Sequence, residues 1–380
     1  MTLLDEIKKD GEILEINFGP QHPSTHGVFR MRVLLEGETV RELKPVMGYL
    51  HRNQEQIAEN TTYAGIVGFT DRMDYINALS NNFSYCLTAE KLASIEVPER
   101  AAYIRIIMAE LARLINHSAA VGFLLNDLGS FFTPLLYALR ERERILDVFE
   151  AVTGSRMMCN YFRFGGVKRD LDEDSLAAIK TIVRKFPRFL DEFETLLTSN
   201  EILCMRCQNV GVLPADLAVN AGITGPTLRA SGVNYDIRKI DRYGLYDRFD
   251  FKVPLGKKGD VYDRYYIRIL EMRESVKILE QALQALPAGD FIHPKTAPLL
   301  RNPRNFKPPV GEAYGRTESP KGELGFYLVS DGTPQPWRCH VRAPSLINLS
   351  ALEAMCLGQK IADIMIILGS IDIVLGETDR

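Results

Sequence analysis

Two of the chain's six histidines, His22 and His26, lie four residues apart in the stretch FGPQHPSTHGVFR, residues 18–30. On a helix this spacing places both imidazole rings on one face, the usual arrangement for binding a metal ion. Two prolines and Gly27 interrupt the stretch, so we expect a rigid loop instead. A rigid loop with polar tips is a common way to build a site. The alternative is that the rings are solvated or bonded to the backbone.

Asp127 is the only charge in the run SAAVGFLLNDLGSFFTPLLYAL, residues 118–139. A carboxylate in so apolar a run is costly unless it is paired. It is therefore either the N-cap of a following helix or the buried partner of a histidine or arginine, whose protonation it tunes. The run is long enough to span a membrane, but Gly129 and Pro134 interrupt it. We interpret it as a buried helix, a turn and a second helix.

A third candidate is Tyr75, at the end of TDRMDY, where Asp71, Arg72 and Asp74 surround it. This segment is either a solvated helix start or part of a site. A phenol stays protonated at neutral pH and is therefore a proton donor.

Cys204 and Cys207 form a single CxxC, which can be half of a metal site or a redox pair. Neither a second CxxC nor a helical HxxxH is present to complete a zinc site. The sequence favours two ordinary buried or half-buried thiols, and the other four scattered cysteines fit a reducing compartment.

The composition excludes several function classes. The net charge of −3 gives no global basic field for nucleic acid. The start, MTLLDEIKKDGEILEIN, mixes acids and bases without an apolar core, so we do not expect a signal peptide. The chain has neither a GxGxxG after a strand nor a GxxxxGK[ST], so a nucleotide site has no support from sequence.

The expected fold is α+β and mainly α-helical, with four regions in one compact unit. They are an N-terminal β region (1–44), a helical core (45–290), a Pro-rich connector with a β-hairpin (291–345) and a C-terminal helix with a tail (346–380). Strand patterns cover 12–18 and 28–44, and helical periodicity covers 100–117, 133–154, 175–198, with a kink near Pro187, and 260–286. The hairpin is expected from GELGFYLVSDG and PWRCHVRAP, and the tail ends in a polar strap. From these residues alone, the chain is an α-rich domain with a possible His–Asp–Tyr site.

Long motifs in the same order resemble the D subunits of the NADH:quinone oxidoreductases (respiratory complex I). The resemblance covers residue 15 to the C-terminus, and its motifs are GPQHPSTHGVFR, GYLHRNQEQIAENTTY, TDRMDY, LLNDLGSFFTPLLYALRERE, NYFRFGGVKRDL, LRASGVNYDIRK, SPKGELGFYLVSDG and LGSIDIVLGETDR. It implies a helical core like that of the related nickel–iron hydrogenase large subunit. It also implies a role in the proton-translocating enzyme, with no activity expected of the isolated chain.

The hydrogenase relationship raises the question of a metal. Hydrogenases bind nickel through two CxxC pairs, and the corresponding segments here are IVGFTD and DIVLGE. Val67, Thr70, Val374 and Glu377 stand where the thiolates would be. Nickel needs soft thiolate ligands, so we expect neither a bound metal nor hydrogenase activity. The resemblance implies that this chain binds no other cofactor.

The resemblance implies that the former metal cavity receives a quinone head-group as substrate. Tyr75 and His26 would be its hydrogen-bond and proton partners, and Asp127 would be the carboxylate paired with His26. His22, Asp372 and Val374 would line or support this slot. Arg52 and Arg72 would lie near the [4Fe–4S] cluster of a small partner subunit, where positive charge favours the reduced cluster.

The expected partners are this small subunit, other peripheral-arm subunits and the membrane arm, with a peripheral location on the cytoplasmic face of the cell membrane. Two alternatives stay open at this point. The chain could serve a related complex that takes electrons from ferredoxin or reduced deazaflavin, or it could be a non-catalytic scaffold.

Three features depart from the family pattern. Met158, followed by Cys159, stands where many members have a histidine, so we expect a weaker link between pH and the potential of the cluster. Asn53 replaces the glycine of HRG. The connector at 293–311 is shorter than in many members, which could alter contact with a neighbouring subunit.

Overall fold

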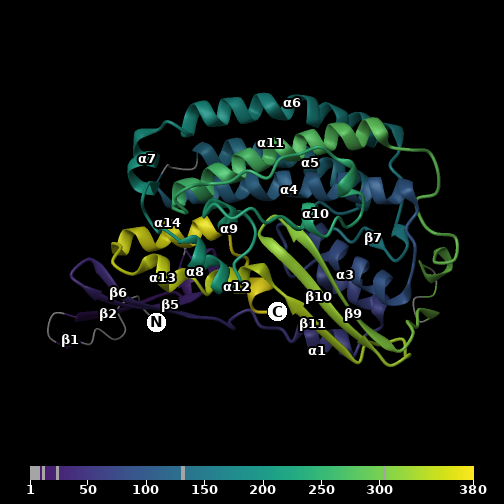
Figure 1. The fold of residues 1–380 in the computed structure, drawn as a ribbon, viewed down its shortest axis with the longest axis horizontal. Helices are drawn as coiled ribbons and strands as arrows, with labels where there is room; N and C mark the ends of the chain where they lie inside the picture. The colour runs from purple at the N-terminus through teal and green to yellow at the C-terminus, as the bar shows by residue number, and fades with distance from the viewer. Residues whose placement is uncertain (1–8, 11–12, 23–24, 130–132, 301, 303–304) are drawn as a thin grey trace.

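Four long helices, α4 (Glu99–Asp127), α5 (Thr133–Thr153), α6 (Glu173–Leu197) and α11 (Val261–Ala285), lie side by side and form a helical body, with α6 along its top edge in Figure 1. The structure is a computed structural model that describes residues 9–10, 13–22, 25–129, 133–300, 302 and 305–380. Helix α4 contacts α5 and α11, so apolar side chains are buried on most of its faces. The predicted helices are thus confirmed, although the predicted helix over 100–117 is part of a longer one.

Aspartate side chains cap the N-termini of two of these helices. Asp172 caps α6 by accepting a hydrogen bond from Ser175 N, and Asp260 caps α11 by accepting one from Asp263 N. Helix α6 continues through Pro187. The apolar run at 118–139 forms the end of α4 and the start of α5, as predicted, with 130–132 outside the described residues. Within the described ranges, no helix is both long and apolar enough to cross a membrane.

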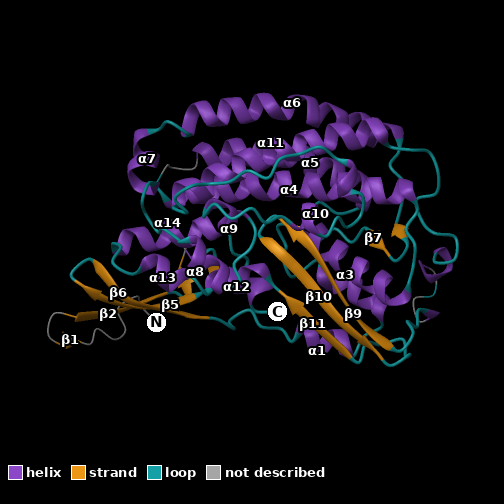
Figure 2. Cartoon of the chain, in the orientation of Figure 1, coloured by secondary structure: helices purple, strands orange, loops and turns teal. Residues whose placement is uncertain are grey.

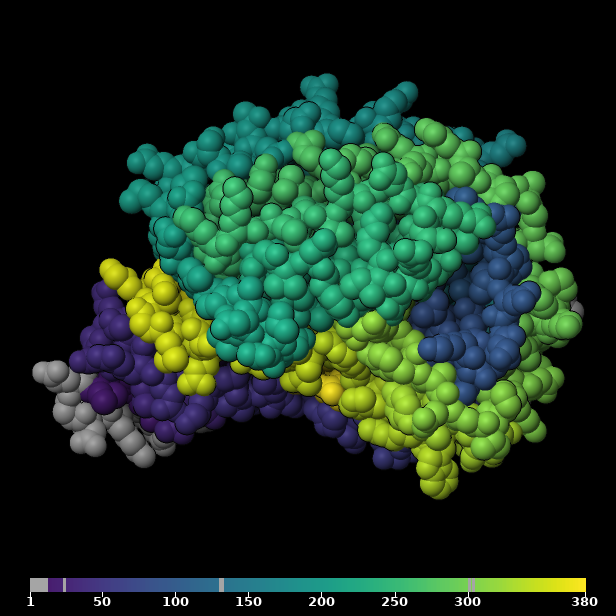
Figure 3. All heavy atoms as spheres, in the orientation of Figure 1, coloured from purple at the N-terminus to yellow at the C-terminus, as the bar shows by residue number. Residues whose placement is uncertain are grey.

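The N-terminal strands form an antiparallel sheet in the order β1 (Lys9–Asp10), β2 (Ile13–Phe18), β5 (Arg30–Glu36) and β6 (Thr39–Val46). The C-terminal part of the chain lies against it, as Figure 3 shows in yellow beside purple. Two backbone hydrogen bonds of 2.9 Å, from Gly358 N to Val40 O and from Ile361 N to Glu38 O, join the two ends of the sequence. The predicted N-terminal sheet is confirmed.

A second antiparallel sheet has the order β11 (Arg338–Arg342), β10 (Gly322–Ser330), β9 (Gly311–Ser319) (Figure 2). The predicted hairpin is the β10–β11 pair, but the prediction missed β9. Its sequence, GEAYGRTES, has two glycines and few apolar residues, so it is typical of a connector. Small residues are required there because a Cβ at Gly315 would lie 2.4 Å from the Thr88 hydroxyl oxygen.

Shorter elements fill the remaining positions. They are β3 (Gln21–His22), β4 (Gly27–Val28), α1 (Gln54–Glu59), α2 (Tyr63–Thr70), α3 (Ala78–Ala93), β7 (Phe162–Arg163), β8 (Gly166–Val167), α7 (Glu201–Cys207), α8 (Ala215–Asn220), α9 (Pro226–Ala230), α10 (Ile237–Ile240), α12 (Pro344–Leu349), α13 (Leu352–Cys356), α14 (Ile361–Ile371) and α15 (Leu375–Thr378). The predicted apolar helix of the tail is α14. The expected polar strap is instead α15, whose polar side chains are buried because α12 packs against it.

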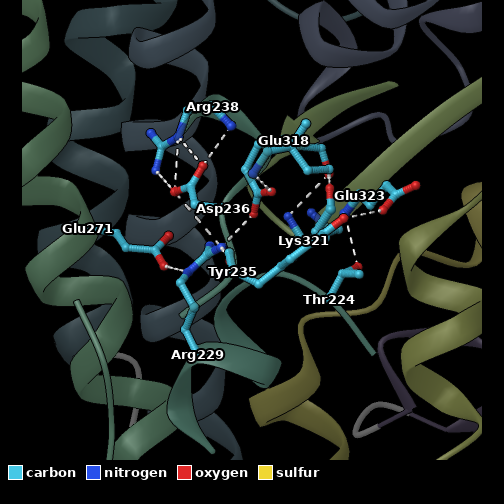
Figure 4. A network of polar contacts seen from close by, with 12 residues as sticks. Thr224, Arg229, Tyr235, Asp236, Arg238, Glu271, Glu318, Lys321 and Glu323 are labelled. Carbon is cyan, nitrogen blue, oxygen red and sulfur yellow. Dashed lines mark hydrogen bonds and ion pairs between the residues drawn. The ribbon is translucent and has the colours of Figure 1, made fainter. Parts of the chain in front are cut away.

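A network of buried charges connects the helical body to the second sheet (Figure 4). Arg229 of α9 pairs with Glu271 of α11 at 2.6 Å and with Glu318 of β9 at 2.7 Å. Arg238 of α10 lies 3.3 Å from Glu110 of α4. All five side chains are buried, so each ionised group needs an opposite charge nearby. These pairs therefore fix how the helices and the sheet meet.

The first prediction concerns Glu271, which contacts both Arg229 and His117 Nε2, the latter at 3.0 Å. Glu271→Ala leaves Arg229 with one partner fewer, and we expect it to lower the free energy of unfolding by about 3–5 kcal/mol. Urea denaturation of the purified chain measures this loss. Glu192→Ala, which breaks an exposed pair with Arg188, is the control and should have little effect. Equal effects of the two substitutions would contradict this role of the network.

Candidate functional site

The loop with the two histidines separates them. Strands β3 and β4 pair antiparallel, and the buried Thr25 hydroxyl lies 2.8 Å from both His22 O and Gly27 O. His26 has a φ of +57°, a left-handed conformation, at the tip of this narrow turn. His22 instead lies edge-on to Phe18, with ring centroids 6.2 Å apart. The loop positions one histidine inward, as a site requires; its residues 23–24, including one of the prolines, lie outside the described part.

Asp127 is the last residue of α4 and the partner of His26. Its Oδ2 lies 2.7 Å from His26 Nε2, and both side chains are largely buried. Of the two predicted roles for Asp127, the structure has the buried partner and not the N-cap. Burial lowers the pKa of His26, but the hydrogen bond and charge of Asp127, together with Asp372, outweigh it and raise this pKa above 6.5. His26 therefore carries its proton to a higher pH than an ordinary histidine.

The pair lies at a cavity of about 330 Å³. This volume suits a small ring and its substituents. Besides the two arginines, the sequence predicted six site residues. Five of them line this cavity, and the sixth, His22, does not. The lining consists of His26, Gly27, Tyr75, Ile76, Asn116, Ala119, Ala120, Phe123, Asn126, Asp127, Leu135, Asp372, Ile373 and Val374. Segments from the N-terminus, the helical body and the C-terminus therefore meet at one place.

Tyr75 reaches this cavity from the turn after α2. Asp74, which is buried, fixes the turn by accepting hydrogen bonds from Ile76 N at 3.1 Å and Asn77 N at 3.2 Å. Burial and the charge of Asp74 raise the pKa of Tyr75, and Lys321 lowers it. The phenol is therefore protonated at neutral pH and can donate. The alternative of a solvated helix start is wrong, because only Arg72 of the charged residues there is exposed.

Sequence reasoning missed two polar residues at this site. Lys321, in the β9–β10 turn, is 1% exposed and lies 3.0 Å from Asp74 and 3.6 Å from Asp372. Asn116 of α4 donates to Asp372 Oδ2 at 2.7 Å and accepts a hydrogen bond from Lys321. A lysine in a Pro–Lys–Gly turn is typical of an exposed hairpin, so it gave no signal. Asn116 could have been predicted, because it is a polar residue on the buried face of a helix.

The two predicted arginines have different surroundings. Arg52 is exposed, and Arg72 is about half exposed and pairs with Asp71 at 2.8 Å. Burial raises the pKa of Asp71 to about 6, and Arg72 opposes this shift. Tyr49 and Phe69, neighbours of these arginines in the sequence, are 42% and 41% exposed. Cations and exposed aromatic rings thus occur together in these segments.

Two of the three departures from the family pattern lie at defined positions in the structure. Asn53 has a φ of +53°, and its Oδ1 lies 2.7 Å from His51 Nε2. Met158, with a φ of +53°, and Cys159 line a narrow cavity that also includes Tyr75. A side chain at position 158 is therefore close to the proposed donor.

The two thiols of the CxxC lie on α7, away from the cavity lining. Cys204 is half-buried and Cys207 is buried, and burial raises the pKa of the Cys207 thiol to about 12. This pair therefore consists of ordinary thiols, as the sequence favoured. Among the described residues, no group of three or more His, Cys, Asp or Glu is arranged to hold a metal ion.

Comparisons with known proteins place the chain in a family. The family "Respiratory-chain NADH dehydrogenase, 49 Kd subunit" matches residues 127–380. The first NADH-quinone oxidoreductase D subunit of Roseiflexus sp. (strain RS-1) is 57% identical over 97% of this chain and 98% of its own length. The second D subunit of Herpetosiphon aurantiacus is 58% identical over 97% and 99%. The D subunit of Dehalococcoides mccartyi (strain BAV1) is 54% identical over 98% and 100%.

The second prediction follows from the cause of the shift at His26. Asp127→Asn removes the charge that opposes burial, so we expect the pKa of His26 to fall below 6.5. NMR titration of the labelled histidine rings measures the change. Because the pKa of His26 is raised in the folded chain, the pair stabilises the fold at low pH, and this contribution is lost as pH rises through that pKa. Asp363→Asn, which alters a carboxylate outside the cavity, is the control. An unchanged pKa of His26 in Asp127→Asn would contradict the role of Asp127 as its charge partner.

Proposed function

Because the chain belongs to the family of respiratory-chain NADH dehydrogenase 49 kDa subunits, the D subunits of NADH-quinone oxidoreductase, we propose that it forms the quinone head-group site of this enzyme. It is one subunit of an oxidoreductase complex, and other subunits of the complex are its partners. The observation that carries the proposal is the convergence of Tyr75 and the His26–Asp127 pair on one cavity of about 330 Å³.

The two donors match the chemistry of a quinone. A quinone has a carbonyl oxygen at each side of its ring, and its reduction takes up two electrons and two protons. The phenol of Tyr75 and the protonated imidazole of His26 can each donate a hydrogen bond to one oxygen and stabilise charge as it develops. The pKa of each group is raised, so each keeps its proton to a higher pH than an ordinary residue of its type. The electrons come from the [4Fe–4S] cluster that we assign to the small partner subunit.

Proton donation by His26 changes the charge of the pair. Asp127, whose side chain is only 8% exposed, loses its cationic partner when the imidazole becomes neutral. An unpaired buried carboxylate is unstable, so Asp127 must move, find another cation or bind a proton. We propose this local change as the step that links quinone reduction to proton translocation; the route beyond Asp127 is a separate question of coupling.

The remaining site residues have supporting roles in this proposal. Val374 supplies an apolar wall for the ring. Asp372 is already engaged by Asn116 and Lys321, so it holds the cavity's shape rather than donating to the quinone. His22 supports the loop that carries His26. These residues thus shape the cavity between the two donors.

We place the small cluster-bearing subunit against the segments that contain Arg52 and Arg72. Positive charge there favours the reduced cluster, because it stabilises the added electron. Tyr49 and Phe69 give these segments exposed aromatic surface, which is typical of protein interfaces. A quinone with an apolar tail reaches the site from a membrane, so we propose a peripheral location on the cytoplasmic face of the cell membrane.

The third prediction tests the tyrosine. In the assembled complex, Tyr75→Ala removes a proton donor, and we expect the quinone reductase rate to fall about 100-fold or more. Tyr75→Phe keeps the ring and should have a milder effect with short-chain quinones. Tyr266→Phe, in α11 and away from the cavity lining, is the control. A near-normal rate in Tyr75→Ala would favour a non-catalytic scaffold.

The fourth prediction tests the histidine. His26→Ala should raise KM for quinone or lower kcat, since it removes a hydrogen-bond donor to the head-group. Steady-state kinetics of the assembled complex with NADH and a short-chain quinone give both constants. His22→Ala is the matched control on the same loop and should have the smaller effect. If neither constant moves in His26→Ala, His26 is not a head-group partner.

A further inference from the structure

A cluster of one cation and three carboxyl groups lies beside the cavity. Lys321 is 3.0 Å from Asp74 and 3.6 Å from Asp372, and its charge also acts on Glu377. All four side chains are buried or nearly so. If every group is ionised, three negative charges face two positive charges, those of Lys321 and of Arg268 in α11, whose charge acts on Asp372. The cluster therefore has an excess of carboxylate, and a proton on one of them is the simplest way to reduce it.

The contacts single out Glu377 as the group that holds this proton. Its Oε2 accepts hydrogen bonds from the backbone N–H of Ser345, at 3.2 Å, and from the Ser345 hydroxyl. Its Oε1 is buried and has no hydrogen-bond partner in the part of the chain that the structure describes. Asp74 and Asp372, in contrast, are each engaged by Lys321 and by further donors. A buried oxygen without compensation is better tolerated in the neutral acid than in the carboxylate.

Electrostatics agree with this geometry. Burial and the neighbouring charge of Asp74 raise the pKa of Glu377 to about 7, while Ser345 and Lys321 oppose the shift. The elements packed around α15 contribute these groups: Ser345 comes from α12, Asp74 from the turn after α2, and Lys321 from the β9–β10 turn.

Three other charged groups lie near this end of the chain. Arg268 of α11 and His26 both interact with Asp372. Asp379 accepts hydrogen bonds from Gly48 N and Leu50 N.

Helix α15 also touches the segment that carries the proposed donor. A Cβ added to Gly376 would lie 2.7 Å from Met73 O and 3.5 Å from the ring of Tyr75. The backbone next to Glu377 is thus packed directly against Tyr75, and Asp74 precedes Tyr75 in the chain. A change of charge at Glu377 therefore occurs next to the place where quinone reduction develops negative charge.

We propose that Glu377 is a proton-holding positioning residue whose ionisation slows quinone reduction at the neighbouring site. This inference rests on the proposed quinone site. When the proton of Glu377 leaves to solvent, the cluster gains one negative charge. This added charge opposes the electrons arriving on the head-group and the transient ionisation of Tyr75. No bond other than the carboxyl O–H breaks in this step.

The experiment measures quinone reduction by the assembled complex from about pH 6 to about pH 8. We expect the wild-type rate to fall through a step near the pKa of Glu377, by roughly threefold to tenfold beyond the fall in Glu377→Gln, which stays neutral. Infrared difference spectra between the same pH values should show a carboxyl C=O band that Glu377→Gln lacks. Glu353→Gln, a carboxyl in α13 outside the cluster, is the control and should keep both signals.

A second variant, Ser345→Ala, tests the same assignment. It removes a hydrogen bond that favours the ionised form, so we expect the pH step and the infrared titration to move to higher pH; a merely structural role would leave both in place. If the complex with Glu377→Gln does not assemble, the shift in Ser345→Ala alone tests the proposal. A step that survives in Glu377→Gln, or an unshifted titration in Ser345→Ala, overturns the proposal. The infrared band does not require quinone, so its loss or survival is independent of the Tyr75 test.

Discussion

Buried charge is the constraint on which this structure depends. The helical body buries arginines, glutamates and a lysine at positions where water cannot stabilise them, so each must meet an opposite charge. Arg229 meets this requirement by joining α11 to β9, and Lys321 does so by joining the β9–β10 turn to Asp74 and Asp372. The contacts that neutralise these groups also bring distant segments to the cavity. Stability and site geometry therefore have one physical cause.

The same constraint gives the site its chemistry. Burial lowers the pKa of His26, and Asp127 together with Asp372 more than offsets this effect. Tyr75 is kept neutral by burial and by Asp74. The pKa of both groups at this cavity is therefore raised. Removal of either proton leaves an uncompensated charge, and in the proposed function this change links quinone reduction to proton translocation.

Periodicity and composition predicted the long helices and the N-terminal sheet, because these elements bury apolar residues at regular spacing. They did not predict β9, whose core positions are glycine and polar residues, or the burial of α15. From the residues alone, Asp127 was either a helix N-cap or a buried partner. Its pairing with His26 did not follow from local sequence patterns, because 101 positions separate the two residues. Lys321 could not be predicted: its turn sequence is typical of solvent exposure, and only the long-range contacts with Asp74 make its burial tolerable.

The most direct measurement of the central claim is a structure of the assembled complex with a short-chain quinone bound. The account predicts that the two carbonyl oxygens of the head-group lie within hydrogen-bond distance, about 2.6–3.2 Å, of the Tyr75 hydroxyl and the His26 ring. It also predicts that the Asp127 carboxylate stays paired with His26 before reduction. A head-group bound elsewhere, with neither Tyr75 nor His26 in contact with it, would contradict the account.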